Sequence, residues 1–286
     1  MLTRALLLTF ALSCGLAAQQ DPEWTAPQTP FHIIGNIYYV GSKGLASYLI
    51  VTPKGDILIN SDLKTSPAQI RNSVEQLGFH FKDIKILLIS HAHFDHDAGS
   101  AEIIRKTGAK YMVMAADVPV VESGGRKDFA YGNSADEWYP PAKVDRVLHD
   151  GDEARLGDTV LVAHLTPGHT KGCTTWTMKV TDGGKTYNVV IVGSPNVNPG
   201  PGYKLVDNKQ YPQIAQDYEK TFRVLKSLPC DVFLGAHGSY FDMKAKLPRM
   251  KKGAANPFID PAGYKAYVAE TERAFQIKLA KQERPQ

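Results

Sequence analysis

Residues 90–99, SHAHFDHDAG, place three histidines and two aspartates in ten positions, directly after the apolar run IKILLI. Such a run is typical of a buried strand, and in an extended segment residues two apart point to the same side. His91 and His93 can therefore reach one metal ion together, while Asp95 and His96 follow a turn and can address a second position. Neutral imidazole and carboxylate form a donor set that suits zinc. The H-x-H-x-D-H spacing predicts a metal site at the end of a buried strand, and an incidental polar turn is the alternative.

Two further histidines stand where a predicted strand gives way to a loop of small residues. His169 lies in LTPGHTKGCTTW and His237 lies in FLGAHGSYFD. Ligand-binding residues gather at strand ends along one edge of an α/β sheet, so we predict that both histidines are metal ligands. The remaining histidines lack such loops and neighbouring ligands, and we expect hydrogen-bonded structural roles for His32, His80, His149 and His164.

Strand and helix patterns alternate along the chain. Apolar β-type runs predict strands over 36–40, 45–51, 55–60, 83–90, 110–115, 159–166, 173–180, 187–194 and 231–237, and the turn TPKGD makes a hairpin of the second and third. Helical periodicity predicts helices over 66–79, 98–108, 211–228 and 260–282. Ser66 is expected to cap the first helix and Asp260 to open the last. Because two similar halves follow each other without a linker, the pattern indicates one α/β domain over 19–286.

Residues 123–143 are rich in glycine, proline and polar residues and show no periodicity. We predict a long loop here. Long loops in compact domains are usually functional or mobile.

The first eighteen residues have the layout of a secretory signal peptide, with a basic start, an apolar stretch and small residues before Ala18. The stretch is too short to span a membrane comfortably, and no later run approaches twenty apolar residues. We predict export to a bacterial periplasm, with lipid attachment through Cys14 as the minor alternative. The apolar contexts of Cys173 and Cys230 favour buried free thiols, although an oxidising compartment permits a disulfide. A net charge of +4 without a long basic run gives no basis for nucleic-acid binding.

The motifs HAHFDH, TPGHT and GAHGSYFD, in this order and spacing, resemble the metallo-β-lactamase superfamily across roughly residues 30–282. The resemblance implies an αββα sandwich, in which two mixed β-sheets pack face to face with helices outside and a zinc site lies at one edge.

One position distinguishes the branches of this superfamily. Glyoxalase II, lactonases and phosphodiesterases of this fold have a strand ending in Gly-Asp, whose aspartate bridges both metals, and two subclasses of the β-lactamases have cysteine there. The matching strand here is NVVIVGSPNVNPG, which places Ser194 at that position. A hydroxyl is a poor zinc ligand, so the second ion needs another donor, which His96 can provide. The chain therefore resembles the third subclass of class B β-lactamases, as do the segments PGYKL and ANPFIDPAGY.

Carried over by position, the resemblance implies two zinc ions, the first held by His91, His93 and His169 and the second by Asp95, His96 and His237. A hydroxide bridging the ions would attack the β-lactam amide of penicillins, cephalosporins and carbapenems, with Asp95 orienting it, and would thereby give antibiotic resistance. The resemblance also implies that Ser194 and Asn196 hydrogen-bond the substrate carboxylate and that Tyr203 helps to polarise the lactam carbonyl. Asn196 departs from the family's usual Ser or Thr.

The expected partner is thus a small β-lactam, and the expected state is a monomer. Two alternatives stay open. The first is a zinc hydrolase of the same fold acting on lactones, thioesters or phosphoesters, against which Ser194 argues because it replaces the bridging acid. The second is a periplasmic zinc-binding or carrier protein without turnover.

Overall fold

The apolar runs predicted as strands assemble into two β-sheets in the computed structural model, which describes residues 21–251 and 253–284. The first sheet has the order β1-β2-β3-β4-β5-β6-β7, with bounds Phe31–Ile34, Ile37–Tyr39, Tyr48–Thr52, Gly55–Ile59, Ile84–Leu88, Lys110–Met114 and Arg146–Leu148. The second has the order β12-β11-β10-β9-β8, and in chain order its strands are Glu153–Leu156, Thr159–Leu165, Thr174–Asp182, Lys185–Val192 and Val232–Gly235.

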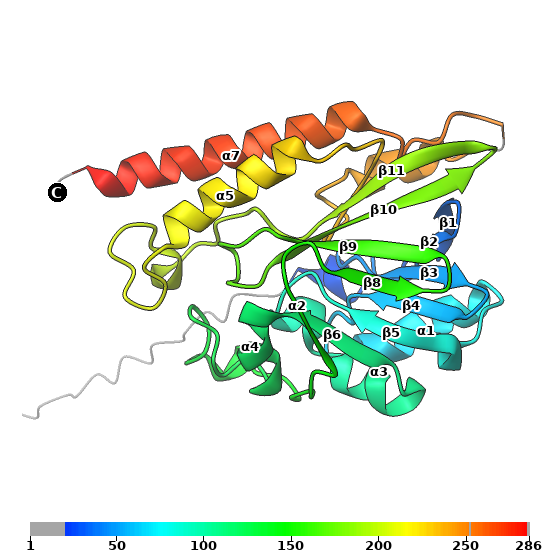
Figure 1. Ribbon diagram of the computed structural model, residues 1–286, viewed down its shortest axis with the longest axis horizontal. Coiled ribbons are helices and arrows are strands. Elements are labelled where there is room, and N and C mark those ends of the chain that lie inside the picture. Colours follow the sequence, from blue (N-terminus) through cyan, green and yellow to red (C-terminus); the bar gives the residue numbers. More distant parts are fainter. Residues whose placement is uncertain (1–20, 252, 285–286) are drawn as a thin grey trace, which may run out of the picture.

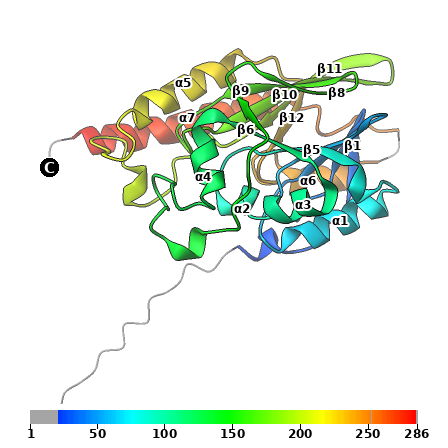
Figure 2. The ribbon, with the colours of Figure 1, turned by 60° about the horizontal axis from the view of Figure 1, so that its bottom comes forward.

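Helices cover the outer faces of both sheets. They are α1 Ser66–Gln76, α2 Phe94–Asp97, α3 Ser100–Thr107, α4 Val118–Glu122, α5 Ile214–Ser227, α6 Met243–Lys246 and α7 Pro261–Glu283. Figures 1 and 2 show α1 and α3 on the outside of the first sheet and α5 and α7 on the outside of the second. The predicted αββα sandwich is therefore confirmed.

Two cores follow from this layering. The larger contains side chains from both sheets, such as Tyr48 and Trp176, together with inward residues of α5 and α7 such as Phe222 and Phe275. The smaller lies beneath α1 and α3 and includes Ile70. Because each sheet has one face on the larger core and one under helices, both faces of the central strands are apolar.

Strand direction decides where the loops of interest emerge. β4, β5 and β6 pair in parallel, and so do β11 and β12 in the other sheet. Parallel strands end at a common edge, so the residues that follow β5 and β12 leave their sheets at carboxyl ends, where α/β folds place ligands.

Some local predictions need correction. Thr65, not Ser66, is the cap residue of α1, and Ser66 is the first helical residue, followed by Pro67 as predicted. The helix ends at Gln76, three residues before the predicted end, because Gly78 adopts a positive φ of 84° that terminates it. Asp260 does cap α7, accepting a hydrogen bond from Gly263 N at 2.8 Å.

The predicted leader and Cys14 lie outside the described residues. The predicted single domain over 19–286 extends beyond them at both ends and stays a prediction. Cys173 is buried and Cys230 is half-buried, and both are free thiols, as predicted. Within residues 21–251 and 253–284, no helix is long and apolar enough to cross a bilayer.

Candidate metal centre

The loop after β5 carries four of the predicted ligands. The carbonyl of Ser90, the second residue after β5, accepts a hydrogen bond from Thr174 N of β10 at 2.7 Å, which holds the loop against the second sheet. His93 is extended, and Asp95 and His96 lie within the single turn of α2 that redirects the chain. The extended placement of His93 is as predicted, whereas Asp95 and His96 form part of the turn and do not follow it.

The other two predicted ligands come from the second sheet. His169 lies in the loop between β9 and β10, where its Nδ1 is 2.8 Å from the Asn196 carbonyl oxygen. A carbonyl only accepts hydrogen bonds, so this contact puts the ring proton on Nδ1 and leaves a lone pair on Nε2. His237 follows β12 directly, and its ring packs between those of Trp24 and Tyr240.

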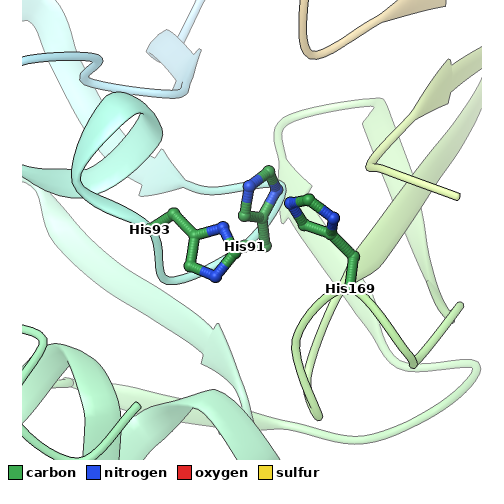
Figure 3. A group of neighbouring side chains, drawn as sticks. All are labelled: His91, His93 and His169. Carbon is green, nitrogen blue, oxygen red and sulfur yellow. The ribbon is translucent and has the colours of Figure 1, made fainter. Parts of the chain in front are cut away.

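Three buried imidazoles converge from these two loops. His91, His93 and His169 each offer one nitrogen, and the three atoms all lie within 4.8 Å of one another. Their ring centroids are 4.6 to 4.8 Å apart, and Figure 3 shows the rings turned toward one another.

A second group lies beside the first. Asp95 Oδ2 is 3.2 Å from His96 Nε2 and 3.5 Å from His237 Nε2, and the two ring nitrogens are 3.1 Å apart. Asp95 and His96 also lie within 4.8 Å of His91, atom to atom, so the two groups are adjacent. All six predicted metal ligands therefore come together, from three loops that leave the two sheets.

The donor atoms fit a divalent metal. Nε2 of His91 is buried and has no hydrogen-bond partner among the described residues, which costs free energy unless another group binds it. Five imidazoles and one carboxylate are the mixed nitrogen and oxygen set that zinc accepts.

The protonation states of three of these histidines favour the binding of a metal cation. Burial, followed by the charges of neighbouring imidazoles, lowers the pKa of His91 well below its usual value, that of His169 to about 3 and that of His237 to about 4. These rings are therefore neutral and able to ligate at neutral pH. His93 differs, because Asp128 outweighs burial and raises its pKa.

A cavity of about 670 Å³ opens over the ligand groups. His93, Asp95, His169 and His237 form part of its wall. Tyr131, Asp136 and Glu137 contribute another part, so the predicted long loop over 123–143 does border the site. Trp24 and Tyr240 also line it, and neither was predicted from the sequence because nothing in their local pattern marks a cavity wall.

Of the predicted substrate-binding residues Asn196 and Ser194, one lies in the cavity wall and the other lies beneath it. Asn196 lines the cavity, and its Nδ2 lies 3.2 Å from the Tyr267 hydroxyl. Ser194 is buried, with Oγ 3.0 Å from the hydroxyl of Tyr240, which does line the cavity.

Tyr203 lies behind the imidazoles. It is 1% exposed, and its hydroxyl donates to the His169 carbonyl at 2.8 Å and lies 3.3 Å from His93 Nε2. It is not among the residues that line the cavity. The expected contact with a substrate carbonyl therefore has no support in this geometry.

The histidines predicted to be structural lie outside both groups. His32 bonds to the Gly35 carbonyl, His164 to Thr177 Oγ1 at 2.8 Å, and His149 pairs with Asp152. His80 is exposed.

Comparisons with known proteins agree with this geometry. A family model described as the metallo-β-lactamase superfamily matches residues 44–237, a span that contains all six converging side chains. The native metallo-β-lactamase FEZ-1 from Legionella gormanii is 56% identical with a TM-score of 0.89, and the match covers 91% of this chain and 98% of that one.

More distant matches point the same way. The class B3 di-zinc metallo-β-lactamase LRA-12 from an Alaskan soil metagenome is 36% identical with a TM-score of 0.86, over 91% of this chain and 98% of that one. A curated protein of Anaeromyxobacter dehalogenans described as a UPF0173 metal-dependent hydrolase is 27% identical over 217 residues, which are 75% of this chain and 69% of that protein.

Proposed function

This chain belongs to the metallo-β-lactamase superfamily, and we propose that it is a zinc-dependent β-lactamase that opens the amide bond of penicillins, cephalosporins and carbapenems. The observation that carries the proposal is the convergence of five imidazoles and Asp95 beside one cavity, four of them in its wall. The resemblance also aligns Ser194 with the metal-bridging acid of related hydrolases. The similarity to class B3 enzymes supports the substrate class. Antibiotic resistance and a periplasmic location, as a monomer exported by the predicted leader, belong to the same proposal.

We assign two zinc ions to the two ligand groups. His91, His93 and His169 would hold the first, and Asp95, His96 and His237 the second. When bound, zinc acts as a Lewis acid and lowers the pKa of a bound water to about 7, which makes a nucleophile available at neutral pH.

The chain's own residues would orient the attacking water and the metal ligands. Burial alone would raise the pKa of Asp95, but His96 and His237 hold it well below its usual range, so the carboxylate stays ionised. Asp95 can thus accept a hydrogen bond from the attacking water and keep it aimed at the lactam carbonyl. The Asn196 carbonyl holds the His169 ring in the tautomer that ligates.

Substrate orientation would fall to polar groups beside the ligands. The Asn196 amide can donate to the substrate carboxylate from the cavity wall. Ser194 is 1% exposed and does not line the cavity, so it would act through water or through the Tyr240 hydroxyl that it contacts. Tyr203 is assigned a positioning role, because its hydroxyl contacts His93 and the His169 carbonyl from behind the cavity.

The test is hydrolysis of a chromogenic cephalosporin by the purified protein before and after exhaustive chelation. We expect chelation to abolish turnover and added zinc to restore it. His169→Ala and His237→Ala should each lower kcat/KM by at least about 10- to 100-fold, the loss seen when residues that only orient metal ligands are removed. His149→Ala is the control, because this exposed histidine lies outside both groups and should leave activity unchanged. Turnover that survives chelation would rule out the scheme.

A second candidate function is zinc-dependent hydrolysis of lactones, thioesters or phosphoesters. The similarity to a curated metal-dependent hydrolase favours it. A protein that cleaves such esters in a zinc-dependent way but leaves cephalosporins intact would support this candidate instead.

A further inference from the structure

A buried carboxylate outside the ligand groups connects the two loops that supply the three-histidine group. Asp117 ends a short 3-10 turn, Ala115–Asp117, that follows β6, and it is 1% exposed. Its Oδ2 accepts hydrogen bonds from Ala92 N at 3.0 Å and from Thr170 Oγ1 at 2.8 Å. Its Oδ1 accepts from Gly172 N at 2.8 Å.

The three donors belong to two segments that are remote in sequence. Ala92 lies between His91 and His93, whereas Thr170 directly follows His169. One carboxylate therefore ties the loop from the first sheet to the loop from the second. The Ala92 peptide is also held by its carbonyl, which accepts from the Tyr139 hydroxyl at 2.7 Å.

The backbone opposite Asp117 is shaped for this contact. A Cβ at Gly172 would lie 2.6 Å from Asp117 Cγ and 2.6 Å from Asp117 N, distances that real Cβ atoms do not reach. Gly172 has no positive φ, so its backbone conformation does not require glycine. The absence of a side chain is needed to let the carboxylate approach.

From these contacts we propose that Asp117 is a positioning residue that sets the separation of His91 and His93 from His169 and so pre-forms the first zinc site. Asp117 is not among the residues that line the cavity, so it acts through the loops rather than on the substrate. Burying a carboxylate is costly unless hydrogen bonds compensate, and all three donors here come from the two ligand-bearing loops. The inference rests on zinc being the metal of the proposed function.

The test measures zinc affinity by competition with a chromophoric chelator, together with the melting temperature of the metal-free protein. Asp117→Asn replaces one acceptor oxygen with an NH₂ group that faces a donor. Gly172→Ala displaces the carboxylate and removes no hydrogen-bonding group. We expect both variants to bind the first zinc 10- to 100-fold more weakly, the range for residues that orient ligands. Thr170→Val, which removes one donor, should weaken binding less.

Asp231→Asn is the matched control. The Asp231 carboxylate also accepts two hydrogen bonds, both from Asn188, from N at 2.8 Å and Nδ2 at 2.9 Å, but it contacts no ligand-bearing loop and does not line the cavity. This variant should lower the melting temperature and leave zinc affinity unchanged. A purely structural role for Asp117 would make its variants behave like this control.

The outcomes separate the two proposals. If the wild type binds zinc and the Asp117 and Gly172 variants bind it equally well, the positioning role is wrong. If those two variants do not fold, Thr170→Val is the deciding variant. Unchanged zinc affinity in Thr170→Val overturns the positioning role of Asp117, and a several-fold loss of affinity supports it. If the wild type binds no zinc, the proposed function fails and takes this inference with it. Normal zinc binding without cephalosporin hydrolysis would refute only the proposed function.

Discussion

At the scale of single residues, the role of each histidine depends on what surrounds its second nitrogen. His169 is 5% exposed, and its Nδ1 is committed to a backbone carbonyl, so its Nε2 is a neutral donor facing other imidazoles. His149 has the same side chain but is exposed and pairs with Asp152. Chemically identical residues thus become a candidate ligand and a surface residue because burial and partners differ.

Tyr203→Phe tests a role at this scale. Because the hydroxyl lies outside the cavity wall and donates to the His169 carbonyl, its loss should weaken zinc binding about fivefold, which corresponds to one ordinary hydrogen bond of about 1 kcal/mol. With zinc saturating, kcat should stay within about fivefold of wild type by the same estimate. The measurement is kcat and KM at saturating zinc, beside the zinc affinity.

The control is Tyr187→Phe, on β11 and outside the cavity wall, which should change neither quantity. A fall in kcat of about a hundredfold at full zinc occupancy would show that Tyr203 contacts the reacting atoms, because effects of that size arise when a transition-state donor is lost.

At the scale of elements, the ligand-bearing loops follow the ends of strands, and the helices pack on the outer faces of the two sheets. The long helix α7 begins at Asp260, whose carboxylate caps Gly263 N. The same carboxylate lies 2.7 Å from Lys246 Nζ, and Lys246 is 3% exposed, with its ammonium over the rings of Phe233 and Phe258. The start of α7 therefore supplies the counter-charge for a buried lysine.

Asp260→Asn should destabilise the fold by about 2–3 kcal/mol at pH 7. Asparagine keeps the cap, so the loss comes from leaving Lys246 charged and buried without its partner, somewhat reduced because Asp260 is partly exposed. Urea unfolding measures this difference.

The double variant Lys246→Met with Asp260→Asn is the control, and it should recover most of the lost stability because no buried charge remains. An unchanged urea midpoint in Asp260→Asn alone would contradict the account.

At the scale of the whole molecule, the site lies where the sheets meet, and this region also buries carboxylates. Burial raises the pKa of Asp62 to about 7 and that of Asp97 to about 7. Asp62 accepts from Ser47, and Asp97 accepts from Ser100 and Tyr111. A carboxyl with a raised pKa binds its proton more tightly in the folded chain. Its stabilising contribution is therefore complete below about pH 4 and is lost as the pH rises through 7.

We therefore expect the metal-free protein to lose about 2–3 kcal/mol of stability between pH 6 and pH 8, roughly 1.4 kcal/mol from each of these two carboxyls. His169 and His237 have lowered pKa values, so their contributions are lost only as the pH falls below about 6.5 and change little in this window. Urea unfolding at pH 6, 7 and 8 measures the slope. Asp97→Asn should reduce it by about half. A stability that does not fall from pH 6 to 8 would show that the two carboxyls do not titrate in this window and would contradict the account.

Much of this molecule follows from local patterns. The periodicity of short segments predicts nine of the strands and the long helices, because residues two or four apart share a face whatever the rest of the chain does. The short strands β1, β7 and β8 were not predicted. The same rule places His91 and His93 on one side of an extended segment, whereas Asp95 lies within the turn of α2. The glycine that ends α1 and the first helical residue were less well predicted, since caps depend on one or two hydrogen bonds at a helix terminus.

The sequence by itself determined the αββα class, the ligand residue types and, through Ser194, the branch of the superfamily that the chain resembles. Only the tertiary structure decided that Tyr203 lies behind the imidazoles, that Tyr131 and Tyr240 line the cavity, and that Asp117 joins two remote loops. The physical reason is that spacing within a segment records which face a side chain takes. Contacts between segments depend on how two sheets pack, and no local pattern encodes that packing.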